Sequence, residues 1–141
     1  MLKLISKVSV NINAPVSKVW QALVDPALIK QYLFGTDAES DWKKGSSIIY
    51  NGVWQGKPYT DKGIIVEIIP EKLLHTTYYS PLSGKEDKPE NYNNVITELK
   101  SGNDFTTVTI SQDNIKDEAE LKHMEQNWGT VLDGMKKLLE K

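Results

Sequence analysis

The chain has 141 residues, of which 39% are apolar and 26% charged, and it contains no cysteine. This length predicts a single domain over residues 1–141 that can bury a sizeable core without a disulfide or a metal ion. The missing cysteine excludes disulfides, iron–sulfur clusters and cysteine nucleophiles. With 17 basic and 19 acidic residues, the net charge of −2 argues against a protein that binds nucleic acid through its phosphates.

The first third of the chain predicts one strand followed by two short helices. Residues 3–13 alternate between apolar and polar side chains, which is typical of a half-buried strand. Pro15 can begin a helix without losing a hydrogen bond, because the N–H that proline lacks would have no partner in the first turn. Apolar residues then recur at helical spacing. Asp25 and Pro26 end this helix and can cap a second one.

The middle of the chain predicts antiparallel strands. Turns that contain glycine or proline separate short runs rich in β-branched and aromatic residues. A polar loop over residues 80–90 joins two of these runs, and we expect it to act either as a lid over a binding site or as an ordinary hairpin loop. The expected strands are 47–54, 63–69, 73–79, 91–99 and 105–112.

The C-terminal part of the chain predicts one long amphipathic helix. Asp117 and Glu120 resemble a capping box, and an apolar stripe then continues to Leu139 over roughly 23 residues. Gly134 lies inside this helix, either where it bends or closely approaches a neighbour, or at a tolerant surface position. Because strands and helices are segregated along the chain, the fold class is α+β. A curved sheet packed on one long helix leaves space for a mostly apolar small-molecule cavity.

Three segments carry a family resemblance by their order and spacing: Ala14–Leu23, Gly63–Leu74 and Asn127–Glu140. They resemble the first helix, the central strand–turn–strand and the last helix of the Bet v 1-like, START-related superfamily, often called SRPBCC. Within it, the chain is similar to the branch related to the activator of the Hsp90 ATPase (Aha1 C-terminal domain-like). Ser80–Gly84, Pro89–Tyr92 and Gln112–Asn114 are similar to a bacterial subgroup of that branch.

The resemblance implies a helix-grip fold. In this fold an antiparallel sheet of about six or seven strands curves around the C-terminal helix, and two short helices follow the first strand. The ligand cavity of the superfamily lies between the sheet and the long helix. One fold hosts many functions, so the resemblance implies the architecture more strongly than the activity.

Candidate cavity residues are polar or aromatic side chains on the expected elements. Alternation places Leu73, His75, Thr77 and Tyr79 on one face of their strand, so His75 points inward if Leu73 does. Asn127 precedes Trp128 and can present a polar group at the cavity mouth, or it can lie on the solvated side of the helix. The candidate ligand-binding residues are Tyr32, Tyr50, Trp54, His75, Tyr79, Tyr92, Gln112, Asn127 and Trp128.

The leading functional hypothesis is a cytoplasmic module that binds a small hydrophobic or aromatic ligand. The low net charge and the two histidines, His75 and His123, favour an uncharged ligand over a phosphate, a metal or nucleic acid. We therefore expect no cofactor, no bound metal, no membrane insertion, and a monomer or weak homodimer.

Two alternatives stay open. The first is a cyclase- or hydrolase-like enzyme that uses His75 with Tyr79 or Gln112 in the same cavity. No catalytic motif is assembled in the sequence, so no catalytic residue is assigned and a binding module is favoured over an enzyme. The second is a co-chaperone that contacts an Hsp90-type ATPase, which the resemblance alone implies.

Overall fold

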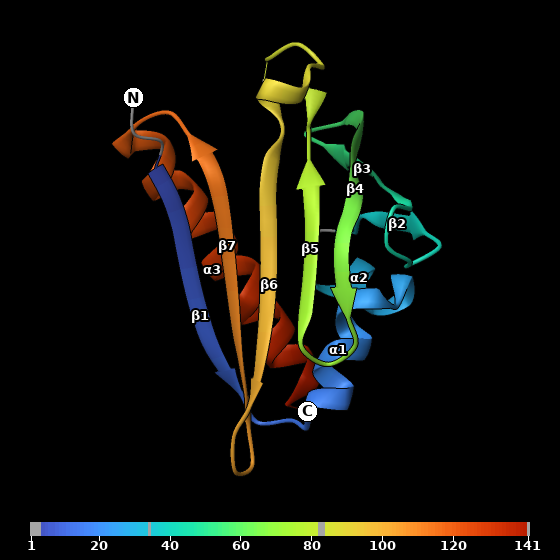
Figure 1. Ribbon diagram of the computed structural model, residues 1–141, viewed down its shortest axis with the longest axis vertical. Helices are drawn as coiled ribbons and strands as arrows, with labels where there is room; N and C mark the ends of the chain where they lie inside the picture. The colour runs from blue at the N-terminus through green and yellow to red at the C-terminus, as the bar shows by residue number, and fades with distance from the viewer. Residues whose placement is uncertain (1–3, 34, 82–83, 141) are drawn as a thin grey trace.

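The computed structural model describes residues 4–33, 35–81 and 84–140, and it describes Trp54 by its main chain only. Over these residues, seven antiparallel strands form one sheet in the order β1-β7-β6-β5-β4-β3-β2, and the helices lie on one side of it (Figure 1). The strands are β1 (Leu4–Ile12), β2 (Asp37–Ser40), β3 (Ser47–Trp54), β4 (Lys57–Ile69), β5 (Leu73–Tyr78), β6 (Asn93–Ser101) and β7 (Thr106–Ile115). The helices are α1 (Val16–Val24), α2 (Pro26–Tyr32), α3 (Glu118–Leu139) and the 3-10 turn η2 (Pro89–Asn91).

Local capping explains where the helices begin. The side chain of Asp25 accepts a hydrogen bond of 2.9 Å from the main-chain N–H of Ala27 and caps α2. The side chain of Asp117 accepts one of 2.9 Å from the N–H of Glu120 and caps α3. Each cap satisfies a helix-terminal donor that has no partner inside its helix. Both helix starts that the sequence predicted are confirmed.

The hairpin between β3 and β4 depends on a tight turn at Gln55 and Gly56. Both residues have positive φ, at 51° and 81°, as a two-residue type I′ turn requires, and this turn matches the twist of the flanking strands. From the sequence, the strand after this turn was expected to begin only at Gly63. In the structure β4 resumes at Lys57, directly after the turn, and Pro58 pairs with Val53.

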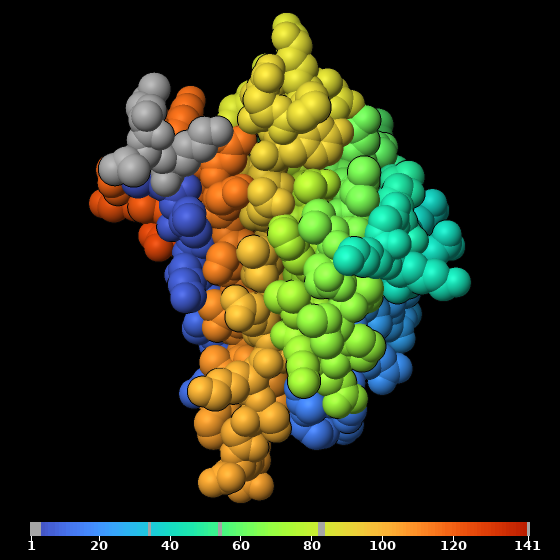
Figure 2. All heavy atoms as spheres, in the orientation of Figure 1, coloured from blue at the N-terminus to red at the C-terminus, as the bar shows by residue number. Residues whose placement is uncertain are grey.

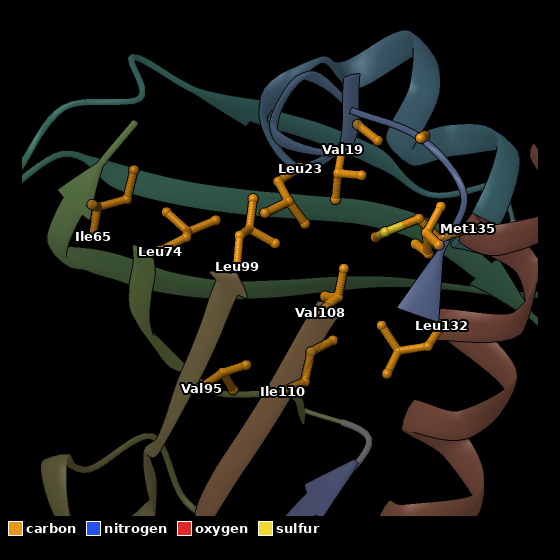
Figure 3. Packing of buried hydrophobic residues seen from close by; sticks show 13 residues of the cluster. Val19, Leu23, Ile65, Leu74, Val95, Leu99, Val108, Ile110, Leu132 and Met135 are labelled. Carbon is orange, nitrogen blue, oxygen red and sulfur yellow. The ribbon is translucent and has the colours of Figure 1, made fainter. Parts of the chain in front are cut away.

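The core lies where α1 and the C-terminal half of α3 face the sheet. Figure 3 shows the side chains of these three parts pointing toward one another. Val19, Ile65 and Val108 are fully buried there, and Leu132 and Met135 of α3 are 1% exposed. Burial of aliphatic side chains of this size stabilises a fold by about 1.5–3 kcal/mol each.

The observed architecture is the α+β helix-grip fold that the resemblance implied. Figure 1 shows α3 crossing the sheet diagonally from behind, with α1 and α2 near its C-terminal end. In the same orientation, Figure 2 shows the opposite, outward face of the sheet. One strand was not predicted: β2 (Asp37–Ser40) has only four residues, of which only Ala38 is apolar, so no alternating pattern marks it.

Among the described residues, no helix combines the length and the apolar character that a membrane crossing requires.

Candidate functional site

A cavity of about 560 Å³ lies between the inner face of the sheet and the helices. Most of the length of α3 lines one side of it with residues spaced three and four apart, which places them on a single helix face. These residues are Glu120, His123, Met124, Asn127, Trp128, Val131 and Met135. The other lining residues are about half apolar or aromatic and half polar, but most of the wall surface is apolar, as is usual for small-molecule sites.

The strands line the cavity through alternate residues. On β5 the lining residues are Leu74, Thr76 and Tyr78, and on β6 Val95 and Thr97 follow the same period of two. The threonine and valine side chains on this wall are shorter than leucine or phenylalanine side chains would be. The curved sheet and these small side chains together leave the space unfilled.

A hydrogen bond joins the helix and the sheet across the cavity. The indole Nε1–H of Trp128 donates to Oε1 of Gln112 on β7 over 2.8 Å. Gln112 is buried, at 5% exposed, and both side chains belong to the cavity wall. The bond fixes the orientation of the indole, because Nε1–H is the only donor of a tryptophan side chain and here it binds Gln112.

Three tyrosines surround the other end of the cavity. Tyr32 donates its O–H to the carbonyl of Ala22 over 2.8 Å, and the rings of Tyr50 and Tyr78 lie 6.4 Å apart at 58°. Burial raises the pKa of all three phenols far above the ordinary value, and for Tyr50 and Tyr78 the negative charge of Asp61 raises the pKa further. The three side chains are therefore neutral hydrogen-bonding groups at any physiological pH.

Asp61 brings a carboxylate into the same end of the cavity. It is 7% exposed and accepts a hydrogen bond at Oδ2 from the Tyr78 hydroxyl. Nearby, Tyr59 and Thr36 share a hydrogen bond of 2.8 Å between their hydroxyl oxygens. The Tyr59 ring lies against Gly52, where a Cβ would come within 2.5 Å of the ring carbon Cζ, so glycine at that position leaves space for the ring.

Five of the predicted cavity residues line the cavity. They are Tyr32, Tyr50, Gln112, Asn127 and Trp128. The backbone of Trp54 belongs to β3, and its side chain lies outside the described part of the structure.

His75 was expected to face the cavity, and the structure places it on the opposite face of the sheet. Because Leu74 and Thr76 point inward, alternation turns His75 outward, where its Nε2 lies 2.9 Å from Oδ1 of Asn94. Asn94 in turn donates from Nδ2 to Asp113 over 2.9 Å. His75 and the inward-facing Gln112 are therefore on opposite faces of the sheet, so the pairing of these two residues that the enzyme alternative offered does not form.

Tyr79 and Tyr92 were also expected at the cavity, but their hydroxyl groups bind the loop after β5 instead. The hydroxyl of Tyr79 donates to the carbonyl of Lys85 and that of Tyr92 to Oδ1 of Asp87, each over 2.6 Å, and the two rings stack at 5.3 Å. Lys62 forms an ion pair with Asp87, and its hydrogen bond is the main cause that lowers the pKa of this carboxyl. The loop expected as a lid contains Leu82 and Ser83, which lie outside the described residues.

Sequence reasoning missed Asp61, Tyr59 and Tyr78. A signal for the first two was present, because Tyr59, Asp61 and Gly63 alternate in phase with the buried Ile65 on β4. The signal went unused because the expected strand began only at Gly63.

A curved antiparallel sheet that holds a long C-terminal helix around an inner cavity defines the helix-grip fold of the Bet v 1-like superfamily. The chain belongs to the family described as "Activator of Hsp90 ATPase homolog 1-like protein", whose model matches residues 13–140. No match was found among curated proteins.

Solved structures with the same fold agree with this assignment. The solution structure of ChR145 from Cytophaga hutchinsonii is 48% identical, covers 99% of this chain and 96% of its own, and has a TM-score of 0.88. The Aha1 dimer from Colwellia psychrerythraea is 19% identical over 97% of this chain and 96% of its own, with a TM-score of 0.77. DynU16, a protein of the dynemicin biosynthetic locus, is 21% identical over 97% of this chain and 47% of its own, with a TM-score of 0.79. At identities this low, the last two comparisons establish the fold alone.

Proposed function

We propose that the protein binds a small, largely apolar or aromatic ligand in the cavity between the sheet and α3. The observation that carries this proposal is an unfilled space of about 560 Å³ with mostly apolar walls. Protein interiors are packed as densely as organic crystals, so a space of this size is not an ordinary packing defect. Ligand sites commonly measure about 300–1,000 Å³ and combine apolar walls with a few polar groups.

The residues proposed to contact the ligand are those that line the wall from both sides. Trp128 and Tyr50 offer flat faces for stacking, and Gln112 and Asn127 offer amide groups. No catalytic set is part of this proposal: the ligand is held and later released unchanged.

Titration with N-phenyl-1-naphthylamine tests the proposal, because this neutral aromatic dye becomes fluorescent when it leaves water. We expect saturable binding to the wild-type protein, with quenching of tryptophan emission as Trp128 transfers energy to the dye. The variant Met124→Trp places a large ring in the cavity from α3, and we expect it to weaken binding about tenfold or more.

The matched control is Glu125→Trp, which places the same ring at the neighbouring position of α3. Glu125 is exposed and does not line the cavity, so dye binding should equal that of the wild type. The proposal is wrong if the wild-type protein shows no saturable binding, or if both tryptophan variants bind as the wild type does.

Contact with an Hsp90-type ATPase is the second candidate function. It is supported by the family match over residues 13–140 and by nothing in the cavity. A pull-down with a purified Hsp90-type chaperone, combined with a measurement of its ATPase rate, tests it; an unchanged rate without co-purification removes it.

A further inference from the structure

Asp61 has an unused hydrogen-bonding oxygen inside the cavity wall. Its side chain is more than nine-tenths buried, and Oδ2 accepts from Tyr78. The other carboxylate oxygen, Oδ1, is buried and has no hydrogen-bond partner among the described residues. Buried polar groups are paired in nearly all native structures, so an unpaired carboxylate oxygen in a cavity wall indicates a missing partner.

Asp61 also takes part in no ion pair among the described residues. A buried carboxylate without a counter-charge is costly, and a cation brought by a ligand would offset that cost.

Three tyrosines of the cavity wall lie near this carboxylate. Tyr50 is its direct register partner on β3, Tyr78 is its hydrogen-bond donor on β5, and Tyr59 precedes it by two residues on the same face of β4. Tyrosine faces attract cations, and rings grouped around a carboxylate are a common way to bind an organic ammonium group. The faces of these rings carry partial negative charge, so they attract a cation more strongly than a neutral hydrogen-bond donor.

We propose that this end of the cavity is an ammonium subsite, so that the ligand is an organic amine with an apolar or aromatic body. The ammonium N–H donates to Oδ1 of Asp61, the tyrosine rings surround the positive charge, and the apolar body lies along α3. This inference rests on the proposed function, and it replaces the uncharged ligand that the composition favoured with a cationic one.

Three probes of matched shape separate the charge from the hydrogen bond and from apolar contact. They are 4-phenylbutylamine, 4-phenylbutan-1-ol and butylbenzene, each tested by displacement of N-phenyl-1-naphthylamine and by calorimetry near neutral pH. The amine is protonated there, as a lysine side chain is. We expect it to bind about ten- to a hundredfold more tightly than the alcohol, and butylbenzene to bind most weakly.

The variant Asp61→Asn keeps the size of the side chain and removes its charge. We expect it to lose the preference for the amine while its affinity for the alcohol and the dye stays near the wild-type value. Asp133→Asn is the control, since it makes the same change in net charge at an exposed position of α3 outside the cavity wall. It should keep the full preference for the amine.

The outcomes distinguish the two proposals. If the dye binds and the amine is no tighter than the alcohol, or if Asp61→Asn keeps the preference for the amine, the ammonium subsite is refuted and the proposed function stands. If neither the dye nor any of the three probes binds, both proposals are overturned.

Discussion

The environment of Tyr50 predicts a specific loss of stability in alkali. Burial is the main cause that raises its pKa above the ordinary value of 10.0, and the Asp61 carboxylate raises it further. Above pH 10 the unfolded chain therefore loses this proton while the folded protein keeps it. Because the folded state then binds more protons than the unfolded state, the free energy of unfolding falls as the pH rises.

The magnitude follows from proton linkage. For a tyrosine that ionises near pH 10 only when the chain is unfolded, raising the pH from about 8 to about 11 lowers the free energy of unfolding by about 1.4 kcal/mol. The pKa values of Tyr32 and Tyr78 are raised in the same direction, so the three phenols together remove about 4 kcal/mol over this interval. That is a large part of the stability of a typical domain, about 5–15 kcal/mol.

Urea unfolding of the wild type and of Tyr50→Phe at several pH values measures this contribution. The variant cannot ionise at this position, so relative to the wild type it should gain about 1.4 kcal/mol between about pH 8 and about pH 11. Ile110→Val, an apolar change in the same cavity wall, should instead differ from the wild type by a constant amount at every pH.

The reasoning about Tyr50 is refuted if the stability difference between Tyr50→Phe and the wild type is the same at both ends of the pH range. Absorbance at about 295 nm gives an independent check, because ionised tyrosine absorbs there. If all six tyrosines of the folded protein ionise near pH 10, the cavity end is wet and burial does not raise these pKa values.

Two further substitutions test the cavity wall and the helix that covers it. Gln112→Leu removes the acceptor of the Trp128 indole and should lower the free energy of unfolding by about 1 kcal/mol, and a double-mutant cycle with Trp128→Phe should return a coupling energy of similar size. A coupling energy near zero would mean that the bond does not hold α3 to the sheet. Gly134→Ala should raise the free energy of unfolding by up to about 1 kcal/mol, because its Cβ would lie 3.6 Å from that of Tyr32, an ordinary contact, and alanine favours the helix. A lower midpoint in urea would show instead that α2 and α3 need glycine at this contact.

Local chemistry made much of the fold predictable. The caps at Asp25 and Asp117 act within three residues of their own position, so the start of α2 and of α3 could be derived from neighbouring residues alone. The stripe of α3 is equally local, since spacing of three and four defines one helix face. These features do not depend on where the sheet lies.

The orientation of β5 could not be derived in this way. Alternation requires His75 and Leu74 to face opposite sides, but it does not say which side faces α3. The apolar Leu73 suggested that its own side, which also carries Tyr79, faces inward, and Tyr79 is indeed buried, at 8% exposed. Tyr79 is held by a hydrogen bond to the carbonyl of Lys85 and by stacking on the ring of Tyr92, contacts that no periodicity reveals.

By itself, the sequence determined the fold class, the order of most elements, the helix caps and the apolar stripe of α3, because each depends on residues close together in the chain. Only the tertiary structure decided which faces meet and that a cavity stays open between them. It brings Asp61, Tyr50 and Tyr78 together from three strands and Trp128 to Gln112 across the space. The physical reason is that curvature and strand order are properties of the whole sheet, so they depend on contacts between residues far apart in the chain.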